Sequence, residues 1–100
     1  MSSTMCEIRS YPLHVGEGFN GKVLIVMPRP LKILSADCEF GTPKVWAIVE
    51  VGGKSEPVIF RMLDEGDEID LVEVGGLQFI DTFTQGGLHV WHVFLDRVGA

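Results

Sequence analysis

The sequence is poor in cysteine and has no long apolar run. Cys6 and Cys38 are its two cysteines; they could pair, but we expect free, partly buried thiols in a reducing compartment. No stretch approaches the ~18 apolar residues that span a membrane. The first ten residues lack the basic and then apolar pattern of a secretory signal. These absences predict a protein of the cytoplasm without membrane contact.

Positive charge is also scarce, and the excess negative charge is concentrated in one segment. The chain has 14 acidic and 8 basic residues, for a net charge of −6. Six of the acids lie together with no Lys or Arg between them: Asp64, Glu65, Asp67, Glu68, Asp70 and Glu73. The other eight acids equal the eight bases in number. Direct nucleic-acid binding is therefore not expected, because it needs concentrated Lys and Arg.

Known catalytic patterns are missing. No serine stands in G-x-S-x-G, Cys38 falls on a predicted inward face where thiols are usually inert, and no histidine can be assigned to Cys6. A flexible acidic segment does not hold two carboxylates at the fixed separation that hydrolysis requires. The sequence therefore predicts a protein that is not an enzyme, with no catalytic residues and no cofactor.

A metal site is not predicted either. The histidines are His14, His89 and His92. His89 and His92 are three apart in a predicted strand and so point to opposite faces, with no further ligand at metal spacing. The acidic run does not fit the spacing of a calcium-binding loop.

What the sequence does contain is a series of glycine-bounded segments with alternating apolar residues, rich in β-branched and aromatic side chains. The predicted strands are 6–15, 22–27, 31–40, 44–51, 56–63, 77–84 and 88–95. They predict an all-β fold, a small antiparallel sandwich or barrel of about seven strands. We expect one domain over 1–100, with 1–5 disordered and 64–72 as the one place for a short helix.

The last two strands form the clearest hairpin. Gly86-Gly87 supplies the positive φ values of a two-residue turn. The alternation puts His92 on the core side and places His89 on the same face as Trp91. In the same way, residues 31–40 are expected to direct Leu34, Ala36, Cys38 and Phe40 inward.

Residues 16–23 match the pattern G-x-G-x-x-G-x-V. In protein kinases such a loop covers ATP phosphates, but the other kinase motifs are missing here. The dinucleotide fingerprint must open a helix, whereas 22–27 reads as a strand. We interpret the segment as a glycine-rich loop, with anion binding by its backbone N–H groups as the alternative.

Four residues are candidates for a ligand site: Trp46, Arg61, His89 and Trp91. Core packing is the ordinary role of a strand tryptophan, and Arg61 is a lone charge in an apolar strand. If all four reach one concave surface, they would stack on and pair with a nucleotide-like anion. The pattern leaves both interpretations open.

The strand 22–27 is apolar on both faces, which fits either a central strand or a subunit contact. Several edge strands add to the surface that needs cover. We therefore expect a homo-oligomer, either a dimer or a larger closed ring.

Two strand motifs carry a family resemblance: Val45-Trp46-Ala47-Ile48-Val49 and Val90-Trp91-His92-Val93-Phe94. With Met27-Pro28 and the segment 32–35, they resemble a family of uncharacterised small proteins of bacteriophages and prophages, over 8–95. Members of that family usually carry a glycine-histidine segment where this chain has 63–68. The resemblance implies a phage origin, and so the cytoplasm of a bacterial host, with no established activity.

These observations lead to a functional prediction with two alternatives. The main prediction is a non-enzymatic phage protein that inhibits a host defence system, with its acidic residues 64–73 contacting a basic surface on a host protein. The first alternative is a homo-oligomeric sponge that sequesters a small anionic, nucleotide-like signal. The second is a structural or assembly component of the virion. The acidic run is also compatible with a solvated loop.

Overall fold

A computed structural model of the chain describes residues 4–14 and 21–97. These residues form seven strands and one short helix: β1 (Cys6–Pro12), β2 (Lys22–Pro28), β3 (Lys32–Glu39), β4 (Thr42–Glu50), β5 (Ser55–Leu63), α1 (Leu71–Val74), β6 (Leu77–Gln85) and β7 (His89–Asp96). The all-β prediction and the position of each strand are confirmed. A short helix also exists, but it begins only at Leu71, within the predicted window of 64–72, and continues beyond that window to Val74. Of the segment 1–5 that was predicted to be disordered, residues 1–3 lie outside the described residues. Met5 is held in place, because its carbonyl accepts a hydrogen bond from Val51 N–H at 2.9 Å.

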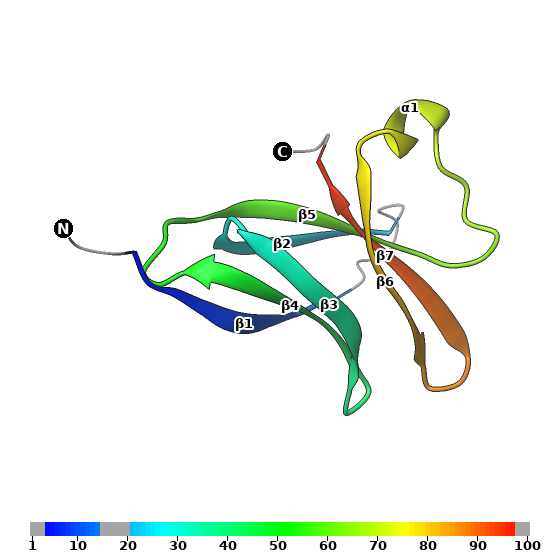
Figure 1. The fold of residues 1–100 in the computed structure, drawn as a ribbon. Coiled ribbons are helices and arrows are strands. Elements are labelled where there is room, and N and C mark those ends of the chain that lie inside the picture. Colours follow the sequence, from blue (N-terminus) through cyan, green and yellow to red (C-terminus); the bar gives the residue numbers. More distant parts are fainter. Residues whose placement is uncertain (1–3, 15–20, 98–100) are drawn as a thin grey trace.

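The strands form two antiparallel sheets with the orders β1-β4-β3 and β2-β5-β7-β6. The sheets stack as a sandwich, with α1 outside the four-stranded sheet (Figure 1). At one edge β3 and β6 meet, where Ala36 N–H donates to the Asp81 carboxylate at 3.2 Å. No strand ladder joins the two sheets within the described residues, so the fold is a sandwich and not a closed barrel.

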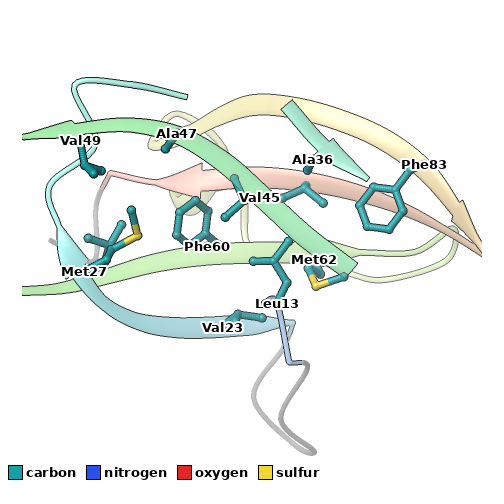
Figure 2. Close-up of a cluster of buried hydrophobic side chains, with 12 residues drawn as sticks. Leu13, Val23, Met27, Ala36, Val45, Ala47, Val49, Phe60, Met62 and Phe83 are labelled. Atoms are coloured by element: carbon teal, nitrogen blue, oxygen red, sulfur yellow. The ribbon is translucent and has the colours of Figure 1, made fainter. Parts of the chain in front are cut away.

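The core lies between the sheets (Figure 2). From β4, Val45, Ala47 and Val49 point inward with at most 1% exposure, as their alternation predicted. Phe60 and Met62 of β5 face them and are fully buried. Burying a Val, Phe or Met side chain contributes roughly 1.5–3 kcal/mol, so these β4 and β5 residues make a substantial part of the core.

A bulge in β3 changes which of its residues face inward. The register with β4 shifts between Ile33 and Ser35, so Leu34 is the extra residue. Because of this one inserted residue, the side chains that precede the bulge face the opposite side of the sheet from the one that simple alternation predicts. Ile33 therefore packs on the core, whereas Leu34 is 42% exposed. Phe40 is fully exposed in a two-residue turn at φ 50°. The inward prediction was wrong for Leu34 and Phe40.

The β6–β7 hairpin is confirmed, but its turn is longer than predicted. Gln85 pairs with His89, which leaves the three residues 86–88 as the connection. Val93 is buried, and Trp91 and Leu95 pack on the core beside it. His92 therefore points outward, and its Nδ1 lies 2.9 Å from the Thr82 hydroxyl. The prediction that His92 faces the core was wrong, because both faces of β7 are apolar enough to be read as inward.

Within the glycine-rich motif 16–23, the structure gives a reason for the glycine at position 21. Residues 16–20, which carry the alternative of anion binding, lie outside the described residues. Gly21 has φ +73°, and a Cβ there would collide with the Met62 carbonyl oxygen. Its own carbonyl accepts from Met62 N–H at 2.8 Å. Only glycine satisfies both the conformation and this close approach.

In the part of the chain that the structure describes, no helix has the length and apolar character needed to cross a membrane.

Candidate functional site

Residues 64–76, here called the acidic connector, join β5 to β6 and project from the four-stranded sheet (Figure 1). Short polar contacts fix their local shape. Asp64 N–H donates to the Asp67 carboxylate at 2.8 Å, closing a turn. The Asp70 carboxylate accepts from Val72 N–H at 3.1 Å and caps the first turn of α1. The connector is thus a folded element built by its own acids.

The C-terminal half of the connector is attached to a buried arginine. Arg61, on the outer face of β5, is 1% exposed, and its Nη1 lies 3.3 Å from the Glu73 carboxylate. The same nitrogen lies 3.6 Å from the carboxylate of Asp96, a β7 residue that is also buried. A buried charge is tolerated only when it is paired. Arg61 therefore holds the connector against the sheet, and it is not part of an open ligand surface.

The N-terminal half is attached through a histidine. The Asp64 carboxylate lies 3.3 Å from His89 Nδ1. This hydrogen bond, together with one from Glu65 N–H, lowers the pKa of Asp64 below its usual value. His89 in turn stacks on Trp91, with ring centroids 5.4 Å apart and planes at 19°. The predicted common face of His89 and Trp91 is confirmed.

The six predicted partner-binding acids therefore divide into groups. Asp64 and Glu73 face basic groups of the same molecule. Asp67 and Asp70 accept backbone N–H groups while remaining exposed. Glu65 and Glu68 are exposed, and among the described residues their side chains have no hydrogen bond or ion pair. The acidic segment is thus only in part an uncommitted charged surface.

Apolar side chains stand at the tip of the connector. Leu71 is 85% exposed and Val72 is 83% exposed, and no residue of α1 is buried. We call Leu71 and Val72 the apolar tip. The sequence reading missed them because they sit within an acidic run. The signal was Asp70-Leu71-Val72-Glu73, since an N-cap acid followed three residues later by Glu is typical of a helix start.

The four predicted ligand-binding residues do not form one site. Trp46 lies half-buried on the outer face of the three-stranded sheet, between Ser10 of β1 and Ser35 of β3. Arg61 is buried on the other sheet, beneath the connector. Only His89 and Trp91 are brought together. The arrangement needed to bind an anion with all four residues is absent.

His89 and Trp91 instead line a shallow pocket of about 370 Å³ between two hairpins. Its lining residues are Leu13, His14, Gly41, Thr42, Pro43, Gln85, His89 and Trp91. The Trp91 indole N–H donates to Gln85 at 2.8 Å, and the Gln85 amide donates to the Gly41 carbonyl at 3.0 Å. Gln85 and His14 were missed because this contact joins segments distant in sequence.

No cluster of three or more His, Cys, Asp or Glu side chains suited to a metal ion occurs within residues 4–14 and 21–97.

The fold and these contacts define a small two-sheet β-sandwich with a projecting acidic connector. Residues 5–99 match the family described as Domain of unknown function (DUF7352), and the chain belongs to that family. No curated protein and no solved structure matches the chain.

Proposed function

We propose that the protein is a non-enzymatic binding protein that acts by protein–protein contact, with the acidic connector as its contact surface. The observation that carries this proposal is the exposure of Leu71 and Val72, at 85% and 83%, on a connector attached at both ends. An apolar residue held in place by its support loses little conformational entropy on binding. The connector is therefore suited to recognition.

The chemistry of the tip defines the partner it fits. Apolar anchors that enter a pocket supply most of the affinity at an interface, and surrounding charges supply orientation and association rate. Here Asp70 directly precedes the apolar tip, and the exposed Glu65 and Glu68 lie earlier in the same connector. A complementary partner has an apolar pocket bordered by Lys and Arg.

As part of this proposal, the partner is a protein of a bacterial defence system and the chain is a phage inhibitor that acts in the host cytoplasm. The resemblance carried by residues 45–49 and 90–94 supports the phage origin, and the defence target follows from the expectation that a small phage protein without catalytic groups interferes with its host. No catalytic role is assigned to the connector, because Asp64 and Glu73 are already bound to internal basic groups.

The small-anion sponge is a second candidate, favoured by one observation. The His89–Trp91 stack lines the 370 Å³ pocket, which also receives His14. A flat ring would find an aromatic surface there, and the histidines would supply the polar contacts. Native mass spectrometry of protein purified from infected cells tests this candidate, since a bound small molecule adds mass that the Trp91→Ala variant lacks.

The protein-contact proposal is tested with two matched substitutions. Leu71→Asp changes the apolar tip, whereas Leu88→Asp changes an equally exposed leucine, 87% accessible, in the β6–β7 turn. Each tagged variant is used to capture proteins from infected bacteria, followed by quantitative mass spectrometry and a defence assay. We expect Leu71→Asp to lose its specific partner at least ~10-fold and to lose inhibition, while Leu88→Asp retains both. Equal capture and inhibition by the two variants would contradict the proposal.

A further inference from the structure

The free edges of the two sheets differ in how they are protected against pairing with another strand. β1 carries charged Glu7 and Arg9 in mid-strand. β3 is interrupted by its bulge. β6 has a second bulge, between Phe79 and Asp81, and lies against β3. Charges, bulges and cover are the usual protections of an edge. β2 has no bulge, and Lys22 is its one charged residue.

The unpaired side of β2 can be located from its ladder with β5. Met62 N–H donates to the Gly21 carbonyl, so Gly21 and Met62 are a hydrogen-bonded pair. Backbone groups alternate along an antiparallel ladder. Leu24 and Val26 therefore direct their N–H and C=O groups away from β5, toward the free edge. No described residue bonds to that edge, and the two side chains are 60% and 64% exposed.

We propose that a second copy of this chain pairs antiparallel with β2, about a two-fold axis at Ile25. In this register Leu24 lies opposite Val26 of the second copy, so the outward-directed backbone groups of each copy meet those of the other. Ile25 lies opposite the same residue of the second copy. The contact is isologous and closes on itself, as in most homodimers.

Charge favours a second copy over an unrelated strand. The two-fold register brings Lys22 of one copy opposite Pro28 of the other. Pro28 and Glu50 line the same groove. They are also close to each other, because a Cβ atom added to Gly53 would lie 3.3 Å from the Cβ atoms of both residues. Lys22 of each copy thus approaches Glu50 of the other. The one charge on the strand then meets an opposite charge, and Glu7 and Arg9, which line the same groove, are paired with each other at 2.8 Å.

One end of the dimer contact lies beside the acidic connector, whose Gly66, Asp67 and Glu68 line a pocket with Gly21, the residue before β2. β2 and β6 are opposite edges of the four-stranded sheet, and the connector is attached at β5 and β7 through Arg61 and His89. Pairing along β2 therefore joins two sandwiches, each with its own connector. The inference does not rest on the proposed function, since it concerns the free edge of β2.

The solution mass of the full chain tests the inference. Light scattering after size exclusion is expected to give twice the 11.0 kDa chain mass for the wild type. Val26→Lys is expected to reduce this to one chain, while Val90→Lys, an exposed valine on β7 of the same sheet, keeps two. A wild-type mass of one chain up to about 1 mM overturns the inference, whether or not a peptide from another protein binds β2. A dimer unaffected by Val26→Lys overturns it equally.

A charge exchange gives an independent reading that does not depend on how Val26→Lys folds. Lys22→Glu places like charges together and is expected to weaken dimerisation about 10-fold, and adding Glu50→Lys to the same chain is expected to restore it. A lack of restoration, with both variants folded by circular dichroism, counts against the register and overturns the proposal as stated.

Discussion

At the base of the acidic connector Glu73 meets a guanidinium that is 1% exposed, whereas Glu65 and Glu68, earlier in the connector, face solvent. These acids belong to the same run of sequence and differ in what lies beneath them. Below the base is Arg61, which needs a partner because it is buried. The comparison shows that a net charge of −6 says little about a surface until the internal bases have been placed.

The largest loss of folding stability is expected at the base of the connector, where two carboxylates face Arg61. Asp96→Asn removes a carboxylate that is 8% exposed and faces Arg61, and losing one partner of a buried pair costs about 3 kcal/mol. Glu73→Gln removes the other carboxylate, but its 40% exposed side chain is screened by water, so we expect about 1 kcal/mol or less. Urea unfolding of the two variants measures the difference. An equal loss would show that Arg61 does not depend on the buried partner.

The base of the connector also shows where sequence reasoning succeeds and fails. In β4, one face is plainly apolar, and Val45 and Val49 were placed correctly. Arg61 stood out as a lone charge, but its partners come from the returning connector and from β7, which only the tertiary fold brings together. Neither bulge has a glycine or proline to mark it, so the orientation of Leu34 was read incorrectly.

Only part of the candidate site could be predicted from the sequence. The pair His89 and Trp91 follows from alternation within one strand, and it was found. The apolar tip did not follow, because a four-residue helix is too short to produce a helical periodicity. Trp46 was grouped with Trp91 although the two lie on different sheets, and strand order is not encoded in any local pattern.

A smaller loss of folding stability is expected where Asp64 attaches the N-terminal half of the connector to His89, and this loss depends on pH. The pKa of Asp64 is lowered in the folded state, chiefly by its hydrogen bond with His89. The stabilisation is therefore present above the ordinary carboxyl pKa of about 4 and is lost as the pH falls through the lower folded value. We expect Asp64→Asn to be less stable than the wild type at pH 7, with the difference shrinking below about pH 4. Denaturant titrations at pH 7 and pH 3 measure this, and a difference that grows on acidification would contradict it.

The most direct test of the comparison between base and tip is the backbone mobility of α1. ¹⁵N relaxation of the full chain gives order parameters for Leu71 and Val72, whose side chains are exposed while the connector is attached through Glu73. A connector held at both ends predicts values near 0.85, like those of a rigid strand such as β5. Values below about 0.6 would mean that the tip is a flexible loop, and an ordered contact surface would then have no support.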